Sequence, residues 1–494
     1  MKITRIARGL LAGLLGCAAA AVPAAVGTST AQADVASTLV FSKNTEGHDC
    51  YRIPTVVKAD DGALLAFAEG RNGGASFCND LGAIDLVMKR STDGGKTWSA
   101  LQTVIKANGD TKGNPAPIVI PGSDRVVLLS TMQCFTNPDC GRVPRVSISE
   151  DNGKTWGAPK VLTTELGFPS APSWLATGPS HGIVLTRGVH KGRLVAGMSY
   201  SNVGALVYSD DNGTTWHLGA TDKPAVSTMN PQEISVTELT DGRVYAAARN
   251  QANDGDKCLL DGTHNRAFAI SSDGGATFSS KFAFATDLVA PTVEGSTARM
   301  SATDTGGKYN RILFAAPSTC DRRKELRVHS SFDEGANWTG TAGSLLVWGQ
   351  DAAYSDMVQL SQFSAGVLFE AGPEFHANDT IRYATVTETA LGAPACGGGY
   401  SVLDSKPLGT AGTVYLSYNA ANGQNCVSTM KSAATGTPTA TSAFLEVQGS
   451  TRQTDSGSFS WFAGPVKAAA ADKCVKWGGA TGGASFASEF EHCG

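Results

Sequence analysis

Several cations stand in short, β-like runs where an apolar residue would be expected. Arg52 lies in the run Tyr-Arg-Ile-Pro, Arg249 ends the run Val-Tyr-Ala-Ala-Ala-Arg, and Arg322 and Arg323 follow Cys320. Converging guanidinium groups bind a carboxylate through paired, charge-assisted hydrogen bonds. An arginine at the end of a strand is more often a surface ion pair. The hypothesis of an anion-binding site therefore depends on all of these arginines together.

Acid–base groups occur in similar surroundings. Tyr354 lies in Ala-Ala-Tyr-Ser-Asp-Met, Glu233 in Asn-Pro-Gln-Glu-Ile, Asp80 in Cys-Asn-Asp-Leu, and Glu370 ends Ala-Gly-Val-Leu-Phe-Glu. Taken singly, a tyrosine in a strand packs and a loop carboxylate caps or is solvated. Together with the arginines they could supply a nucleophile, a base and a proton donor.

The elements that must position these groups are marked by a repeated octet, Ser-x-Asp-x-Gly-x-Thr-Trp. Asp-x-Gly and Asn-Gly favour hairpin turns, because they supply positive φ and a side-chain bond to the backbone. The terminal aromatic ring can fix the turn onto a neighbouring sheet. The five copies start about 60 residues apart and are Ser91–Trp98, Ser149–Trp156, Ser209–Trp216, Ser271–Phe278 and Ser331–Trp338.

This period predicts an all-β repeat architecture. A unit of about 60 residues holds about four short strands, and radial repetition of four-stranded sheets gives a β-propeller. Thr38 to Thr389 would hold six such blades, so one blade is expected to lack the octet. We assign the octets a structural role and no catalytic one.

The composition is that of an ordinary globular protein. Of 494 residues, 41% are hydrophobic and 17% charged, and the formal net charge is −4. Without a basic excess, nucleic acid and anionic membrane surfaces are not expected as partners. No stretch after the leader is long and apolar enough to span a membrane.

Residues 1–33 are predicted to be a signal peptide. Basic residues precede an apolar, alanine-rich run from Leu10 to Val26, and Ala-Gln-Ala stands before Asp34. Cleavage after Ala33 would give a secreted protein. The alternative is lipoprotein processing at Cys17, which we favour less because a leucine of the Leu-Leu-Gly-Cys motif is atypical at its position.

An exported chain with an even number of cysteines is expected to form disulfides. Removing the leader leaves ten of the eleven cysteines. Sequence does not fix the connectivity. The pairings we expect are Cys134–Cys140, Cys396–Cys426 and Cys474–Cys493, with Cys50–Cys78 and Cys258–Cys320 left by elimination. No Cys/His spacing is typical of a zinc site, so no metal is expected.

The chain changes character near Ala390. Residues 390–494 are rich in Gly, Ala, Ser and Thr, carry four cysteines and contain no octet. We interpret them as a small, disulfide-rich β-module of unknown role. The module is similar to small secreted modules of spore-forming actinobacteria.

From about Thr38 to Thr389 the chain resembles the bacterial sialidase (neuraminidase) family of retaining exo-α-sialidases. The resemblance rests on Arg-Ile-Pro before the first repeat, the octets (the family's Asp boxes), the Asp-x-Gly-x-Ile-Asp-Leu-Val run, Glu-Leu-x-Asp-Gly-Arg ahead of an arginine, and Tyr-Ser-Asp before a strand that ends in Glu. It implies a six-bladed propeller at residues 34–389, three arginines that bind a carboxylate, a Tyr/Glu pair and an acid/base aspartate.

Each family role falls on a residue of this chain. Tyr354 matches the nucleophile, Glu233 its base and Asp80 the acid/base, with Asp85 a weaker rival expected to form buried hydrogen bonds. The substrate-binding matches are Arg52, Arg249 and Arg323, with Arg322 a live alternative to the last, together with Glu370, which would orient Arg52, and Arg71, which would reach the substrate.

The implied chemistry suits these residue types. Sialic acid carries a carboxylate on its anomeric carbon, so an attacking carboxylate would be repelled, whereas a neutral phenol would not. The resemblance implies hydrolysis of sialylated glycoproteins, gangliosides and oligosaccharides without a cofactor. The oligomeric state is open, and a monomer is the default expectation. The alternatives are a trans-sialidase, an intramolecular sialidase that forms an anhydro sugar, and a catalytically inactive sialic-acid-binding propeller.

Overall fold

The computed structural model is built from β-strands. It describes residues 34–72, 78–135, 141–168, 172, 174–252, 266–307, 310–320, 322–341, 344–388, 390–391, 396, 400–420, 422–431, 433–434, 437–459 and 461–494. A short 3₁₀ turn, η2 (Thr303–Thr305), interrupts the strands. No helix of the described residues has the length and hydropathy needed to cross a bilayer.

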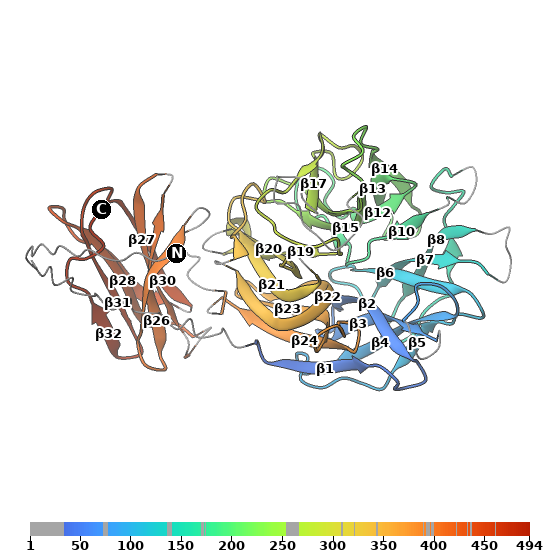
Figure 1. Ribbon diagram of the computed structural model, residues 1–494, viewed down its shortest axis with the longest axis horizontal. Coiled ribbons are helices and arrows are strands. Elements are labelled where there is room, and N and C mark those ends of the chain that lie inside the picture. Colours follow the sequence, from blue (N-terminus) through green and yellow to red (C-terminus); the bar gives the residue numbers. More distant parts are fainter. Residues whose placement is uncertain are drawn as a thin grey trace, which may run out of the picture. The chain divides into compact units, whose positions relative to one another are not determined.

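The octet-bearing part contains the first twenty-four strands of the described chain (Figure 1). These are β1 (Ser37–Ser42), β2 (Cys50–Lys58), β3 (Leu64–Arg71), β4 (Ile84–Ser91), β5 (Gln102–Ile105), β6 (Thr111–Val119), β7 (Val126–Gln133), β8 (Arg142–Ser149), β9 (Lys160–Val161), β10 (Leu175–Thr177), β11 (Ile183–Val184), β12 (Leu194–Tyr200), β13 (Val203–Ser209), β14 (His217–Asp222), β15 (Pro231–Glu238), β16 (Val244–Asn250), β17 (Arg266–Ser271), β18 (Ser280–Phe284), β19 (Ser296–Ser301), β20 (Arg311–Pro317), β21 (Lys324–Ser331), β22 (Leu345–Ser361), β23 (Ser364–Gly372) and β24 (Thr380–Thr387).

These strands pair antiparallel in chain order, apart from one parallel bridge between β4 and β6 at Ile84 and Thr111. The bridge joins the set β2–β5 to the set β6–β9. Strand β22 is long enough to pair with β21 through its first half and with β23 through its second. The first strand, β1, pairs with β24, so the N-terminal strand completes the last sheet.

One strand of each set lies innermost, and these strands contact one another in sequence. Strand β2 contacts β6, β6 contacts β10, β10 contacts β15, β15 contacts β19, β19 contacts β22, and β22 contacts β2 again (Figure 1). Apolar cores fill the spaces between neighbouring sets, for example Val127 and Leu129 against Leu194 and Trp216. Such cores hold the innermost strands side by side.

Each octet forms the same hydrogen-bonded turn. In Ser91–Trp98, Asp93 accepts the Thr97 N–H at 3.0 Å and the Thr97 hydroxyl at 2.6 Å, while Ser91 Oγ accepts the Gly95 N–H at 2.9 Å. The bonds recur at Asp151, Asp211, Asp273 and Asp333. These contacts confirm the predicted turn chemistry.

The octets also attach each sheet to a neighbouring sheet. The ring of Trp98 meets the edge of Tyr383, and that of Trp156 meets Phe67, with centroids 5.5 and 5.8 Å apart. At Gly95, φ is +90° and a Cβ would lie 2.2 Å from the Tyr383 ring. Glycine is therefore needed there for both the backbone angle and the close approach.

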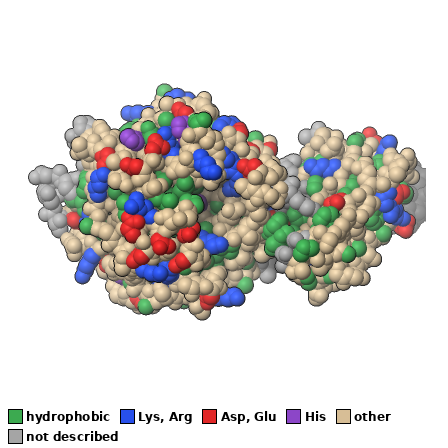
Figure 2. Space-filling model, turned by 180° about the vertical axis from the view of Figure 1, so that it is seen from behind, with side chains coloured by type: hydrophobic (Ala, Val, Ile, Leu, Met, Phe, Trp, Pro, Cys, Tyr) green, Lys and Arg blue, Asp and Glu red, His purple; other side chains and the backbone are tan. Residues whose placement is uncertain are grey.

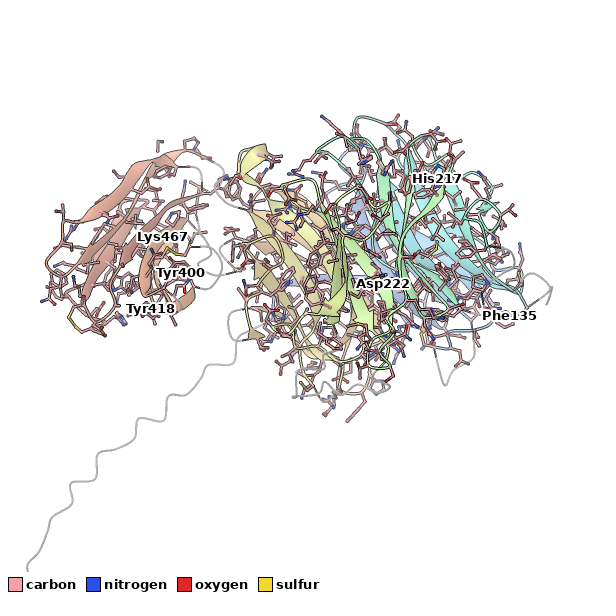
Figure 3. The ribbon with its side chains drawn as sticks, turned by 90° about the horizontal axis from the view of Figure 1, so that it is seen from above. Phe135, His217, Asp222, Tyr400, Tyr418 and Lys467 are labelled. Atoms are coloured by element: carbon pink, nitrogen blue, oxygen red, sulfur yellow. A yellow bond between two sulfur atoms is a disulfide. The ribbon has the colours of Figure 1, made fainter. Side chains whose placement is uncertain are left out.

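The described chain ends in two antiparallel sheets, β25-β26-β27-β30 and β29-β28-β31-β32, packed around Leu416, Val427, Leu445 and Trp477. Tyr400, Tyr418 and Lys467 belong to this part (Figure 3). The strands are β25 (Ser401–Pro407), β26 (Gly412–Asn419), β27 (Gln424–Lys431), β28 (Thr439–Val447), β29 (Gln453–Phe459), β30 (Phe462–Ala469), β31 (Val475–Thr481) and β32 (Ala484–Ala487).

Three of the predicted disulfides are present, namely Cys50–Cys78, Cys396–Cys426 and Cys474–Cys493. Cys134 and Cys320 are also disulfide-bonded. Their expected partners, Cys140 and Cys258, lie outside the described residues, as do the leader and Cys17.

On the face drawn in Figure 2, acidic and basic side chains are interspersed.

Candidate active site

The predicted nucleophile and its base are in contact. Tyr354 lies on β22, is 6% exposed, and donates its phenol hydrogen to Glu233 Oε1 from β15. Arg249 Nη1 donates to Glu233 Oε2 at 2.7 Å and to the Tyr354 oxygen at 2.9 Å. A phenol, a carboxylate and a guanidinium from three strands thus form one buried hydrogen-bonded group.

A recurring β-bulge aims these side chains. The strand register shifts between Arg52 and Thr55 in β2, between Gln232 and Ile234 in β15, and between Ala352 and Ser355 in β22. Each shift lies near the start of an innermost strand or, in β22, at the start of its second half. A bulge redirects a side chain away from regular alternation.

Two residues at the bulges have left-handed backbone angles. Ile53 has φ +56° and Glu233 has φ +48°. Such angles are unfavourable for a β-branched residue and uncommon for a glutamate. They persist where the surrounding structure determines them, and they are found at functional sites.

Glu370 joins the strand of the first arginine to the strand of the tyrosine. Its Oε1 accepts from Arg52 Nε at 2.6 Å and from the Ile53 N–H at 2.9 Å, and its Oε2 accepts the Tyr354 N–H at 3.2 Å. Glu370 is fully buried. The Arg52 guanidinium lies 5.4 Å from the centroid of the Tyr354 ring.

The two candidates for the third arginine differ in direction. Arg323 Nη2 donates to the Thr292 carbonyl at 2.8 Å, and its charge acts on both Tyr354 and Asp80. Arg322 forms an ion pair with Glu374 at 2.9 Å. The geometry therefore places Arg323, and not Arg322, with the other two arginines.

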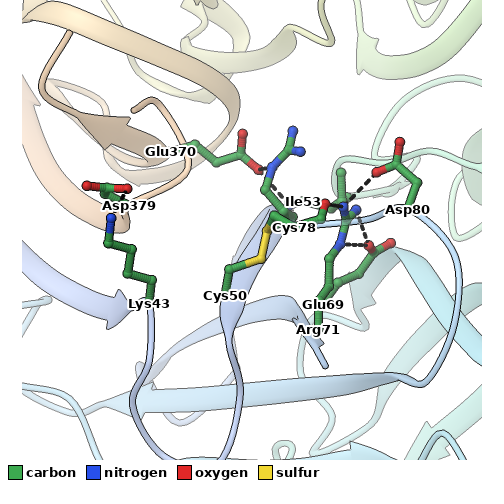
Figure 4. Close-up of a disulfide and its surroundings, with 10 residues drawn as sticks. Lys43, Cys50, Ile53, Glu69, Arg71, Cys78, Asp80, Glu370 and Asp379 are labelled. Carbon is green, nitrogen blue, oxygen red and sulfur yellow. Dashed lines mark hydrogen bonds and ion pairs between the residues drawn. A yellow bond between two sulfur atoms is a disulfide. The ribbon is translucent and has the colours of Figure 1, made fainter. Parts of the chain in front are cut away.

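Asp80 is held by the arginine that precedes its loop. Arg71 Nη1 donates to Asp80 Oδ1 at 2.6 Å and to the Cys78 carbonyl at 2.7 Å. Glu69 anchors the same guanidinium through two hydrogen bonds of 2.6 and 3.0 Å. The Cys50–Cys78 disulfide attaches this loop to β2, two residues before Arg52 (Figure 4).

Electrostatics set the protonation of the two reacting groups in opposite ways. Burial raises the pKa of the Tyr354 phenol far above its ordinary value, and the charge of Glu233 raises it further. The nearby arginines lower this pKa but do not cancel the rise. Partial desolvation raises the pKa of Asp80, whose side chain is 81% exposed, but Arg71, Arg52 and Arg323 outweigh that effect and hold the pKa below its ordinary value. The site therefore contains a neutral phenol and an ionised Asp80.

Asp85 makes the hydrogen bonds expected of it, but from a half-buried position. Its Oδ2 lies 3.0 Å from His48 Nε2, and its Oδ1 accepts the Ala107 N–H at 2.6 Å. A Cβ on Gly70 would lie 2.6 Å from the His48 ring. This pair therefore supports β3 between Glu69 and Arg71.

A cavity of about 280 Å³ contains the predicted groups Asp80, Glu233, Tyr354 and Arg71. Sequence reasoning missed other residues of its wall, among them Leu81, Asn114, Gln133, Arg142 and Trp174. The Arg142 guanidinium stacks 4.3 Å from the centroid of the Trp174 ring. Arg142 is a cation at the start of an apolar strand, and the same feature indicated Arg52 in the sequence. No repeat context marks Trp174.

Glu294 is a second residue that sequence reasoning missed. It is 2% exposed, and its Oε2 accepts the N–H of Ser355, the neighbour of Tyr354. Burial raises its pKa well above the ordinary value, with Asp356 contributing. A buried carboxyl group thus lies beneath the strand of the nucleophile, and the charge of Arg266 opposes the rise of its pKa.

Within the described residues, the one cluster with metal-ligand spacing lies in the C-terminal sheets and consists of Asp404, Glu491 and His492. The cavity wall holds no such cluster among those residues.

Comparison with known proteins identifies the repeat. Residues 62–368 match the family model described as BNR repeat-like domain. The chain is 30% identical over 372 residues to a sialidase of Micromonospora viridifaciens, covering 70% of this chain and 53% of that protein. It is 25% identical over 346 residues to a sialidase of Bacteroides fragilis, covering 65% and 60%. The chain thus spans little more than half the length of these relatives.

Two further likenesses concern the fold and a segment of 112 residues. The Hadza microbial sialidase Hz136 shares the fold, with a TM-score of 0.59 at 22% identity, covering 71% of this chain and 68% of that one. Over 112 residues the chain is 41% identical to Spore-associated protein A of Streptomyces coelicolor, covering 22% of this chain and 72% of that protein. With its family match and these relatives, the chain belongs to the bacterial sialidase family, among the BNR repeat-like proteins.

Proposed function

We propose that this chain is an exo-α-sialidase that hydrolyses terminal α-linked sialic acids of glycoproteins, gangliosides and oligosaccharides with retention of configuration. The observation that carries the proposal is the hydroxyl of Tyr354, bonded to Glu233 and Arg249 beside a cluster of cations. Relatives named sialidase and exo-alpha-sialidase support the same reaction.

The arginines select the substrate by its charge. Arg52, Arg249 and Arg323 surround Tyr354, and their guanidinium groups would pair with the carboxylate on the anomeric carbon. Glu370 keeps Arg52 extended by binding its Nε, which leaves both terminal nitrogens for the substrate. A neutral sugar would leave these buried cations without that partner.

Tyr354 would attack the anomeric carbon. A carboxylate nucleophile would be repelled by the substrate's own carboxylate in this buried site, whereas a phenol approaches as a neutral group. Glu233 takes the phenol proton during attack, and Arg249 stabilises the negative charge that develops on the oxygen. The product of this step is a tyrosyl–sialyl intermediate.

Asp80 would act first as an acid and then as a base. Without substrate, Arg71, Arg52 and Arg323 keep it ionised. Because the substrate carboxylate neutralises part of this positive charge, substrate binding raises the pKa of Asp80 and favours its protonated form. Asp80 then protonates the leaving oxygen and later deprotonates the water that releases the sugar. No cofactor takes part in this scheme.

Hydrolysis of an aryl sialoside, followed by NMR of the first sugar formed, tests the proposal. We expect free α-sialic acid first from the wild type and no normal turnover by Tyr354→Phe. Full activity of that variant, or a first-formed β-anomer, would remove Tyr354 from the mechanism.

The same measurement separates a second reaction. A structural neighbour with a TM-score of 0.59 is a leech intramolecular trans-sialidase complexed with 2,7-anhydro-Neu5Ac. An anhydro sugar as the first product would assign that reaction to this chain, and a transferred sugar would assign a trans-sialidase. Binding without turnover would leave a sialic-acid-binding propeller.

The proposed architecture is a six-bladed propeller at residues 34–389. Its blades would be β2–β5, β6–β9, β10–β14, β15–β18, β19–β21, and β22–β24 with β1. The closed sequence of contacts among the innermost strands supports it. Residues 390–494 would form a separate module. We place the segment related to Spore-associated protein A there, because the BNR repeat-like match ends at residue 368.

The proposed location is outside the cell, after removal of residues 1–33. Lipid attachment at Cys17 is the alternative. The N-terminal sequence of the protein from culture medium would decide, since cleavage after Ala33 leaves Asp34 as the first residue. The protein is proposed to act as a monomer.

A further inference from the structure

The C-terminal sheets contain a cleft of about 350 Å³ that the function proposed above does not use. It lies where the start of β27, the end of β30 and the turn between β28 and β29 come together. Its polar wall consists of Gln424, Ser450, Thr451, Gln453 and Lys467. A cavity of this volume is in the range of small-molecule and sugar sites.

Lys467 is the cation of the cleft. Its Nζ lies 4.9 Å from the centroid of the Tyr400 ring (Figure 3). Its side chain is exposed to solvent, and partial desolvation lowers its pKa. Among the described residues it has no carboxylate within ion-pair distance, whereas Arg452 in the same sheets pairs with Glu446 at 2.9 Å. An exposed ammonium without a protein counter-ion at the wall of the cleft is available to pair with a carboxylate of a ligand.

The remaining polar groups are suited to hydroxyls. The Tyr400 hydroxyl donates to Gln424 Oε1 at 2.7 Å, which fixes the Gln424 amide at the wall of the cleft. The side chains of Ser450, Thr451 and Gln453 make no hydrogen bond to protein within the described residues. Hydroxyl and amide groups both donate and accept, so they match the hydroxyls of a sugar better than they match an anion.

We propose that this cleft binds one carboxylate-bearing sugar unit of a polysaccharide and is separate from the catalytic cavity. The carboxylate pairs with Lys467 over the Tyr400 ring, and the sugar hydroxyls bond with Gln424, Thr451 and Gln453. A single lysine among neutral groups suits one carboxylate, whereas phosphate recognition is typically built from several donors and arginine forks. The inference does not depend on the catalytic activity.

Native gel electrophoresis of the full chain tests the site. Gels contain polygalacturonate as the probe, and gels with neutral dextran give the reference mobility. We expect polygalacturonate to retard the wild type and Lys467→Ala to lose at least half of this retardation. Lys467→Arg keeps the cation and should retain most of it.

The matched control is Lys406→Ala. Lys406 lies in the same sheets and over an aromatic ring, 5.6 Å from the Phe486 centroid, but it is not part of the cleft. Lys406→Ala removes the same charge as Lys467→Ala, so an equal loss of retardation in the two variants would overturn the proposal. Arg52→Ala tests the catalytic cavity, and a loss confined to it would also overturn the proposal. So would no retardation of the wild type, or retardation only by a phosphodiester polymer.

Discussion

Arg249 Nη1 lies 2.9 Å from the oxygen of Tyr354 and shares its contact with Glu233. One guanidinium nitrogen thus binds both the phenol that would attack and the carboxylate that would take its proton. Among the described residues, the second terminal nitrogen of Arg249 makes no hydrogen bond, so it would bind the substrate carboxylate in the proposed reaction. This arrangement would couple substrate binding to the chemical step.

Arg249→Lys separates these roles. An ammonium is a compact charge without the planar fork, so it cannot hold the phenol, Glu233 and a substrate carboxylate together. Losing a hydrogen bond to a charged group costs about 1.5–3 kcal/mol, or roughly 10–100-fold in rate. Steady-state kinetics on an aryl sialoside should show this fall in kcat as well as a higher KM. An unchanged kcat would limit Arg249 to binding.

The adjacent arginines provide an internal comparison. The charge of Arg323 lowers the pKa of both Tyr354 and Asp80, whereas Arg322 forms an ion pair with Glu374. We expect Arg323→Ala to lower kcat/KM by about 100-fold or more, since a charged hydrogen bond to the substrate is lost. Arg322→Ala should stay within about threefold, because Arg322 pairs with Glu374 and Asp351 and not with the groups around Tyr354. The reverse order in the same assay would assign the third position to Arg322.

The pH dependence of the reaction should report the pKa of Asp80. The acid form is required to protonate the leaving group, so kcat/KM falls as pH rises through this pKa, which lies below the ordinary value when no substrate is bound. Removing the largest cationic influence with Arg71→Gln raises the pKa of Asp80. The fall in kcat/KM on sialyllactose should therefore shift to higher pH.

A substrate with a better leaving group is a control for this shift in the pH profile. An aryl sialoside with an acidic phenol needs little protonation, so the same variant should alter its pH profile less than that of sialyllactose. Equal shifts on both substrates would mean that a group other than Asp80 titrates. A shift to lower pH would contradict the assigned electrostatics.

The Cys50–Cys78 disulfide should matter for acid catalysis. It ties the loop of Asp80 to β2, and Arg71 binds both the Cys78 carbonyl and Asp80. In a Cys50→Ser/Cys78→Ser variant we expect kcat on sialyllactose to fall roughly 10-fold, part of the effect of general acid catalysis. Activity on the aryl sialoside should change less. Cys474→Ser/Cys493→Ser, in the C-terminal sheets, is the control and should leave both rates unchanged.

The parts of this molecule that rest on local patterns follow from its sequence. Octet chemistry depends on residues within four positions of one another, so the spacing of Asp93 and Thr97 is enough to predict their contact. The catalytic groups stand out because charges in apolar runs are unusual. Arg322 and Arg323 could not be separated, because neighbours in a chain differ only in direction, which long-range packing decides.

The bulges and the cavity wall were not predicted, and both depend on residues that are distant in sequence. Ile53 and Glu233 adopt positive φ angles although neither residue favours them. Contacts far away in sequence, such as Glu370 with the Ile53 N–H, determine these angles. Trp174 stacks on Arg142 from a segment without repeat signals. No pattern within a single strand contains this information.

The octet glycine gives a prediction about stability. Gly94 and Gly95 both have positive φ, +77° and +90°, but a Cβ on Gly94 meets nothing within 4 Å, whereas one on Gly95 lies 2.2 Å from the buried Tyr383 ring. Gly94→Ala should lower the free energy of unfolding by about 1 kcal/mol from backbone strain alone. Gly95→Ala adds a clash between sheets and should cost about 1–3 kcal/mol more.

Urea unfolding of the full chain, followed by tryptophan fluorescence, measures this difference. Since Trp98 of the same octet packs against Tyr383, the Gly95→Ala variant should also alter the native emission, whereas Gly94→Ala should not. Equal midpoints for the two variants would mean that the octet turn is not pressed against the neighbouring sheet. The octets would then act as local turns only, and the attachment between sheets would have to come from the apolar cores.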